Sequence, residues 1–197
     1  MNAVRASFGA ATLAYFIPVL VLRLALWLLL EPRDRFKRAP PSDWQYLLGM
    51  AAVWALLGAP LVVWREALMR PALPLAGWLR PAGGAPLAVG LFWWAWALRQ
   101  LGWRRTVGIP SLAKEAEATG VTLETHGPYR FVRNPLYLGE LLGLVGALLV
   151  LHAWLVGALL VLWAAVMRTV IAREQEDMLA RFGAGYREYA SRVPCLF

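Results

Sequence analysis

The sequence predicts an all-α integral membrane protein, a helical bundle with five transmembrane helices of which the last two form a helical hairpin. Two observations on composition support this class. Hydrophobic residues make up 60% of the 197 residues and charged residues only 16%, with a mean hydropathy of +0.54. Soluble domains are usually less apolar and carry about 25% charged residues. A third observation is that the apolar residues form continuous runs of bilayer-spanning length.

Five apolar runs define the expected spans. They are Ala10–Leu30, Trp44–Trp64, Ala85–Leu101, Leu136–Leu151 and Ala153–Ile171. Only His152 separates the last two runs, so we expect a tight helical hairpin there. One long kinked helix is the alternative.

Proline and glycine set the expected boundaries of these elements. Pro32 ends the first run, and Pro60 predicts a kink or an early end near the outer part of the second. Beyond the fifth run, apolar residues recur at helical spacing, interrupted by Gly183 and Gly185. We therefore expect two short C-terminal amphipathic helices on the membrane surface.

The distribution of basic residues predicts the orientation. The net charge is +8, from 20 Lys and Arg against 12 Asp and Glu. With the N-terminus outside, fifteen of the 20 basic residues lie on the inner side and four, Arg5, Arg65, Arg70 and Arg80, on the outer side. The positive-inside rule then favours a multi-pass protein of the cell membrane with a cytoplasmic C-terminus. Because the basic residues flank apolar runs, lipid headgroups rather than nucleic acid are the expected partner.

Arg23 is the one basic residue inside a predicted span. Charge within a membrane is costly and often functional. Because Arg23 lies toward the cytoplasmic end of its run, we favour snorkelling of its side chain to the interface. The lone Cys195 and the two distant histidines, His126 and His152, predict no disulfide and no metal site.

Polar residues able to do chemistry gather at the inner face in two segments, Val121–Tyr137 and Arg168–Glu176. Pro128 and Pro135 restrict the backbone of the first segment, and a preset backbone suits ligand capture. A rigid corner that only aims the fourth helix is the alternative. Neither segment carries the strand and glycine-rich turn of a nucleotide-binding fold.

Four separate elements carry a family resemblance. They are Gly127-Pro128-Tyr129-Arg130-Phe131-Val132-Arg133-Asn134-Pro135-Leu136-Tyr137-Leu138-Gly139, then Arg173-Glu174, then Phe182-Gly183-x-x-Tyr186-x-x-Tyr189, then Arg192-Val193-Pro194. In this order the chain from Val121 to Pro194 resembles the isoprenylcysteine carboxyl methyltransferase family and its bacterial and archaeal membrane relatives.

The resemblance implies a cofactor, S-adenosyl-L-methionine, bound without a Rossmann domain. The positions that match the family's cofactor contacts are Val121, Thr122, Leu123, Glu124, Tyr129, Asn134, Pro135, Leu136, Tyr137 and Glu174, with Lys114 as a further one. Arg173 and Glu174 are the implied catalytic residues, Arg173 to hold a carboxylate acceptor and Glu174 to accept a proton from an amine acceptor. Glu140 could serve as that base, or be a helix N-terminal acid.

Two positions depart from the family pattern. Asn134 stands where a histidine is usual, and asparagine can hydrogen-bond but carries no charge. Val170 stands where an arginine orients the substrate in the eukaryotic enzymes, so Arg173 or Arg168 would have to replace it, or the acceptor differs.

The resulting hypothesis is a membrane methyltransferase that acts on a lipid-like or small hydrophobic acceptor, such as a prenylcysteine carboxylate. The alternatives are a membrane NADPH-dependent sterol-type reductase and a non-enzymatic membrane adaptor. We expect a single membrane domain over residues 1–197. Its first part, 1–101, holds three spans, and 102–197 holds the cofactor-binding loop, hairpin and tail. The sequence leaves the oligomeric state open.

Overall fold

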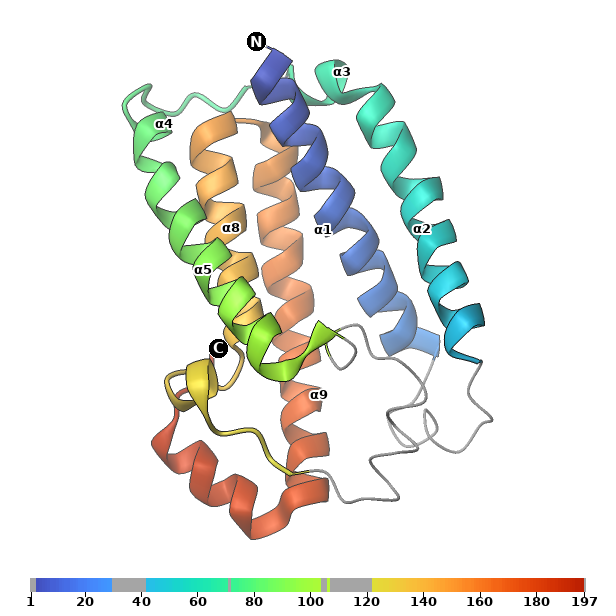
Figure 1. Ribbon diagram of the computed structural model, residues 1–197. Helices are drawn as coiled ribbons and strands as arrows, with labels where there is room; N and C mark the ends of the chain where they lie inside the picture. The colour runs from blue at the N-terminus through green and yellow to red at the C-terminus, as the bar shows by residue number, and fades with distance from the viewer. Residues whose placement is uncertain (1–2, 30–41, 71, 104–105, 107–121, 197) are drawn as a thin grey trace.

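The computed structural model describes residues 3–29, 42–70, 72–103, 106 and 122–196. Within these ranges the fold is all-helical, apart from an isolated bridge between Ala72 and Ala153. The elements are α1 (Ala3–Leu29), α2 (Asp43–Val63), α3 (Arg65–Met69), α4 (Leu79–Ala82), α5 (Gly84–Leu101), the 3₁₀ helix η1 (Gly127–Arg130), α8 (Pro135–Leu151) and α9 (Trp154–Arg192) (Figure 1).

The long helices form one bundle whose two ends differ in content. The N-terminus, α3, α4 and the turn between α8 and α9 lie at one end (Figure 1). The 3₁₀ helix η1, the last part of α9 and the C-terminus lie at the other end. Residues of the loop before α8 and of the chain after the fifth predicted span are therefore neighbours in space.

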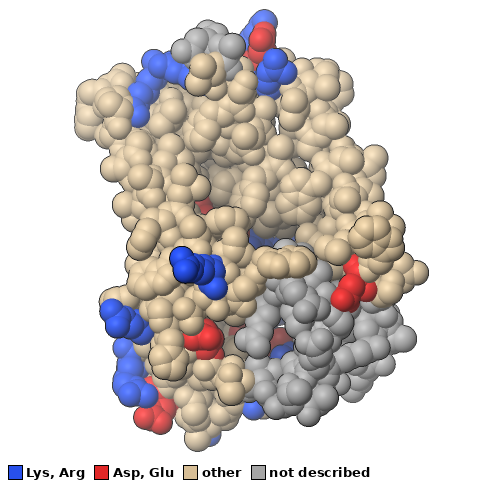
Figure 2. Space-filling view, in the orientation of Figure 1, with Lys and Arg blue, Asp and Glu red and all other residues tan. Residues whose placement is uncertain are grey.

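Three of the described helices are long and apolar enough to cross a membrane: α1 over Val4–Leu24, α2 and α9. The apolar helix α8, with 17 residues, is shorter. On the face shown in Figure 2, charged side chains gather toward the two ends, and the broad band between them carries almost no charge on its surface. The chain is thus a helical membrane protein, and the count of five spans stays a prediction.

The core lies where α1, α8 and α9 meet. Leu13, Leu144, Trp163 and Met167 are each 0% exposed there. Helix α2 packs on the outside of α1 and keeps most of its apolar surface exposed, with Leu56 at 73%. Such a surface suits contact with lipid, since the bilayer interior is as apolar as the side chains themselves.

The beginning and end of α2 follow the local sequence. Ser42 caps the helix in a reciprocal capping box: its hydroxyl accepts from the backbone N–H of Gln45, whose side chain accepts from the backbone N–H of Ser42. The helix ends at Val63, and Trp64 leaves helical geometry with φ −95° and ψ 15°. The helix therefore continues past Pro60 to within one residue of the predicted end of the run, and the alternative of an early end at Pro60 is wrong.

Helices α5 and α8 form the most extensive helix pair, through glycines. A Cβ on Gly139 would lie 2.7 Å from the backbone nitrogen of Trp94, and one on Gly90 would lie 2.7 Å from that of Gly143. The two backbones thus approach too closely for any side chain at these points. Small residues at such contacts are typical of helix pairs in membranes.

The hairpin between α8 and α9 is confirmed, and a single kinked helix is excluded. His152 takes the left-handed conformation (φ 55°, ψ 32°) that ends α8, and its N–H donates to Leu148 O at 2.8 Å. The backbone N–H of Leu73 donates to His152 O at 2.6 Å. The segment before α4 therefore packs directly against the hairpin turn.

The expectation of two short helices after the fifth span is wrong in part. Helix α9 continues without a break to Gly183, where φ 52° and ψ −119° produce a kink, and then resumes to Arg192. No glycine or proline lies between Ile171 and Phe182, so nothing ends the helix after the fifth predicted span. Gly183 takes a positive φ, whereas Gly185 does not and stays helical.

Candidate functional site

The two polar segments meet through Tyr137 and Glu174. Tyr137 lies in the first turn of α8, and Glu174 lies on α9, 37 residues later. The Tyr137 hydroxyl donates a hydrogen bond of 2.6 Å to Oε1 of Glu174. The loop that enters α8 and the part of α9 around Glu174 therefore lie together and make up the candidate site.

The 3₁₀ helix η1 holds Tyr129 beside this pair. Gly127 starts η1 with φ 57°, a conformation that favours glycine. A Cβ there would also lie 2.8 Å from Oε1, the flexible end of the Gln100 side chain. Pro128 is fully buried. The carbonyl oxygen of Tyr129 accepts a 2.7 Å hydrogen bond from the hydroxyl of Tyr189, which lies beyond the α9 kink.

The side chain of Tyr129 lies in a partly buried, negatively charged environment. Burial raises the pKa of its hydroxyl well above the ordinary value of 10, and the neighbouring Tyr189, Glu124 and Glu174 raise it further. The hydroxyl therefore stays protonated at physiological pH and can donate a hydrogen bond.

The C-terminal tail returns to the loop that enters α8. The backbone N–H of Arg133 donates to Pro194 O at 3.0 Å, and its Nη1 donates to Oε1 of Gln175 at 3.2 Å. The side-chain nitrogen of Gln175 contacts Cys195 Sγ at 3.0 Å, and this thiol lies 3.3 Å from Oδ1 of Asn134. These contacts link the loop, α9 and the tail, and they fix the side chain of Asn134.

Other predicted cofactor contacts lie in the same region. Oε1 of Glu124 accepts from Nε2 of Gln100 at 3.2 Å and from the backbone N–H of His126 at 3.1 Å. Leu123 packs against a small cluster of Tyr186, Tyr189 and Val193, while Thr122 is exposed.

The remaining predicted positions divide into three groups. Pro135 is buried at the first position of α8, and Leu136 follows it half-buried. Arg173 is half-buried beside Glu174 on α9. Val121 and Lys114 lie outside the described residues.

Val170, which stands at the family's arginine position, packs against the main apolar core. The structure therefore puts an apolar contact where the eukaryotic pattern has an acceptor-binding cation. Arg168 is exposed and Arg173 is half-buried, and both lie on α9 before the kink at Gly183.

The expectation that Arg23 snorkels to the interface is wrong. Its guanidinium points into the bundle and binds Glu140 in a bidentate pair, Nη1 to Oε2 at 2.6 Å and Nη2 to Oε1 at 2.9 Å. Glu140 is 4% exposed, so it is not a solvated helix-terminal acid. An unpaired carboxylate on α8 draws the arginine inward, because the cost of burying either charge falls when the two are paired.

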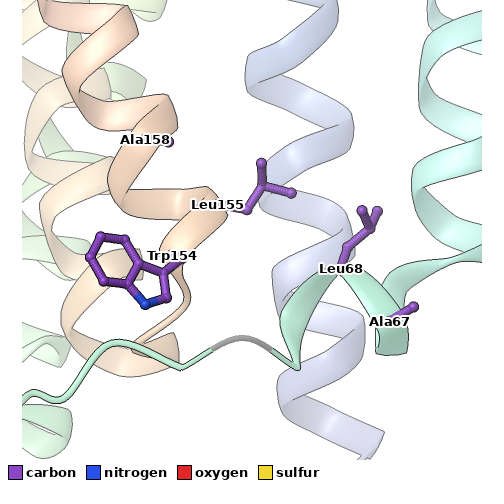
Figure 3. Close-up of a pocket in the computed structure, with 5 residues that line it drawn as sticks. All are labelled: Ala67, Leu68, Trp154, Leu155 and Ala158. Carbon is purple, nitrogen blue, oxygen red and sulfur yellow. The ribbon is translucent and has the colours of Figure 1, made fainter.

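An open apolar pocket of about 410 Å³ lies at the opposite end of the bundle. Ala67 and Leu68 of α3 and Trp154, Leu155 and Ala158 of α9 line it (Figure 3). It contains none of the predicted site residues, and its lining has no charged side chain.

Comparison with known proteins now assigns the family. The family model described as phospholipid methyltransferase matches residues 79–185, which is more than half of the chain. The chain belongs to the phospholipid methyltransferase family. The matched region of this family member starts at α4 and runs past the α9 kink, so it contains η1, Tyr137 and Glu174. The resemblance found in the sequence is confirmed at this level.

One curated relative is the cobalt-zinc-cadmium resistance protein CzcN of Cupriavidus metallidurans, 38% identical over 76 residues. The alignment covers 39% of this family member and 35% of CzcN, so the chain spans only about a third of that relative. No solved structure matches the chain.

Some residues of the site gave no signal in the sequence. Gln100 lies in the last turn of α5, beside Gly127, and donates a hydrogen bond to Glu124, yet it is an ordinary glutamine at the end of an apolar run. The Arg23–Glu140 pair did give a signal. Each is a lone charge within an apolar run, and pairing with the other is an alternative to snorkelling that lowers the cost of placing both charges in a membrane.

Proposed function

We propose that the chain is a membrane S-adenosylmethionine-dependent methyltransferase that acts on a lipid-like or small hydrophobic acceptor at the cytoplasmic face of the cell membrane. The observation that carries this proposal is the Tyr137–Glu174 hydrogen bond, within a region that matches a methyltransferase family. It joins the two segments that the family resemblance associates with the cofactor.

The residues at the site fit this cofactor chemically. The carboxylates of Glu124 and Glu174 suit the hydroxyl and ammonium groups of S-adenosylmethionine, and the tyrosine hydroxyls add donors. Nε of Arg133 is buried and has no acceptor among the described residues, so a bound carboxylate would satisfy it. When bound, the cofactor would supply a methyl group carried on a positively charged sulfur. The leaving group is then a neutral thioether, which needs no proton.

The protein's own residues then have three tasks. Tyr137 and Glu174 hold the cofactor, and the loop and tail contacts exclude water from it. Arg173 holds a carboxylate acceptor, or Glu174 takes the proton of an amine acceptor. Glu140 does not suit the role of base, because Arg23, Tyr15 and Trp163 already donate to its two oxygens.

The acceptor class follows from the surroundings of the site. Residues of α8 and α9 lead from Tyr137 and Glu174 directly into an apolar bundle, so an apolar acceptor can approach from the membrane side. The alternative reductase loses support, because the family model that matches the chain describes methyltransferases. The alignment with the metal-resistance protein CzcN covers only about a third of that protein, which is too little to argue for metal handling by this chain.

Binding of S-adenosylhomocysteine to the detergent-purified chain tests the cofactor, by isothermal titration of the wild type and Glu174→Ala. We expect saturable binding by the wild type and its loss in the folded variant. No binding by the wild type overturns the proposal, whereas equal affinity in the variant removes Glu174 from the site. Radiolabelled cofactor, incubated with the protein and native lipid extract, would identify the acceptor.

A further inference from the structure

A buried polar network centred on Glu140 links four helices of the bundle. Its carboxylate accepts from both terminal nitrogens of Arg23, from the Tyr15 hydroxyl at 3.3 Å and from Nε1 of Trp163 at 3.0 Å. Nε1 of Trp94 donates in turn to Tyr15 at 3.1 Å. The face in Figure 2 is hollowed near its middle, and charged atoms are visible inside the hollow.

Stability alone gives little reason for this pair. Burying two charges is costly, and apolar residues of similar size are often as stabilising as a buried ion pair. The surrounding bundle is apolar, with Leu144 and Met167 fully buried, and could accommodate such residues. The contacts that Arg23 and Glu140 make with other residues therefore indicate whether the pair has a role beyond packing.

The pair reaches the candidate site through Tyr137. The central guanidinium carbon of Arg23 lies 4.7 Å from the centroid of the Tyr137 ring, in cation–π geometry. Glu140 follows Tyr137 by three residues and so lies on the same face of α8. Arg23 thus contacts the ring while Glu174 accepts its hydroxyl, so both ends of the side chain are fixed.

The charge of Arg23 matters for the proposed cofactor. S-adenosylmethionine carries a positive sulfonium, which an unpaired arginine nearby would repel. Glu140 cancels the charge of Arg23 through two hydrogen bonds, and the arginine can then support Tyr137 without repelling a cation.

We propose that Arg23 and Glu140 are positioning residues for the methyl-transfer site: Arg23 holds the ring of Tyr137, and Glu140 holds Arg23 and cancels its charge. The proposal rests on the proposed function, since it takes Tyr137 and Glu174 as cofactor contacts. Arg23 comes from α1, which precedes the region that the family model matches, 79–185. The site then depends on a helix outside the matched region.

The test compares affinities for S-adenosylmethionine, a cation at sulfur, and for S-adenosylhomocysteine, a neutral thioether. Glu140→Gln leaves Arg23 charged and uncompensated, so we expect about tenfold greater loss of affinity for the former than for the latter. The double variant R23M/E140L removes both charges and the support of the ring. Its affinity for both ligands should fall by a similar factor, about tenfold, with an unfolding temperature within a few degrees of the wild type.

Leu13→Ala is the control, because it destabilises the same helix α1 through the apolar core, at a position about 15 Å along the helix from Arg23. The positioning role is overturned if Glu140→Gln and the double variant bind both ligands like the wild type. It is also overturned if their affinities fall only as much as that of Leu13→Ala. Should Glu140→Gln not fold, the double variant decides alone. Absence of binding by the wild type overturns the proposed function, and this inference with it.

Discussion

The hydroxyl of Tyr137 lies 2.6 Å from Oε1 of Glu174 and joins the first turn of α8 to the middle of α9. Hydrogen bonds to charged groups contribute about 1.5–3 kcal/mol. We therefore expect Tyr137→Phe to weaken S-adenosylhomocysteine binding by about ten- to a hundredfold, measured by titration calorimetry. Glu174→Gln can still accept the bond, so it should bind more tightly than Glu174→Ala. Tighter binding by Glu174→Ala than by Glu174→Gln would show that this hydrogen bond does not contribute to cofactor binding.

Arg173 is expected to act on the acceptor rather than on the cofactor. Arg173→Gln should raise KM for the methyl acceptor while the affinity for S-adenosylhomocysteine stays unchanged. Arg187, exposed beyond the kink of α9, gives a matched control, and Arg187→Gln should change neither quantity. A loss of cofactor affinity in Arg173→Gln would assign this arginine to the cofactor instead.

The contact between α5 and α8 predicts opposite effects for two alanine substitutions on one helix. A Cβ at Gly139 would meet the backbone of α5 at 2.7 Å, whereas one at Gly143 would meet nothing within 4 Å. Gly139→Ala should therefore lower the free energy of unfolding by about 1–3 kcal/mol, because two backbones must separate. Gly143→Ala should be neutral or stabilising, since alanine favours a helix. Thermal unfolding in detergent would measure both, and equal effects would contradict the close approach.

The kink in α9 predicts a similar contrast in the tail. Gly183 has φ 52° and ψ −119°, a conformation that costs other residues about 1–3 kcal/mol, while Gly185 is helical. Gly183→Ala should weaken packing of the last turns of α9 on η1 and raise hydrogen exchange in residues 184–192. Gly185→Ala should leave exchange there unchanged or slower. Faster exchange in both variants alike would argue against the kink.

The raised pKa of Tyr129 predicts how stability changes at high pH. In the unfolded chain this tyrosine loses its proton near the ordinary value of about 10, and in the folded chain only at higher pH. Unfolding is then favoured as pH rises above about 10, and the free energy of unfolding should decrease. Tyr129→Phe should show a shallower decrease between pH 9 and 11, measured by chemical unfolding. The same pH dependence of the free energy of unfolding in the variant and the wild type would indicate that the Tyr129 hydroxyl is exposed to water.

Local patterns predicted the helices and the hairpin well, for identifiable reasons. His152 interrupts a long apolar stretch and takes the left-handed turn that separates α8 from α9. The helix boundaries at Val63 and Leu101 lie within a residue of the predicted ends. Turn chemistry and apolar run length are local properties, so one sequence suffices to read them.

Contacts between distant segments were harder to predict. Arg23 and Glu140 are 117 residues apart, and the position of Arg23 along its helix does not say which way the side chain points. In the tail, Gly183 and Gly185 look alike in the sequence and predict two short helices, although Gly183 takes a positive φ and Gly185 stays helical. The family resemblance predicted which segments would be neighbours. Their role in cofactor binding stays a prediction, as do the five spans and the cytoplasmic orientation.

The thiol of Cys195 lies 3.3 Å from the side-chain oxygen of Asn134, and the chain has no other cysteine. A maleimide or bimane probe would consequently label one known position, without prior mutagenesis, next to the loop that enters α8. Half-buried as it is, the sulfur should react more slowly when that loop is held in place. The labelling rate would then report, in native membranes where calorimetry is not practical, whether a ligand is bound at the loop that enters α8.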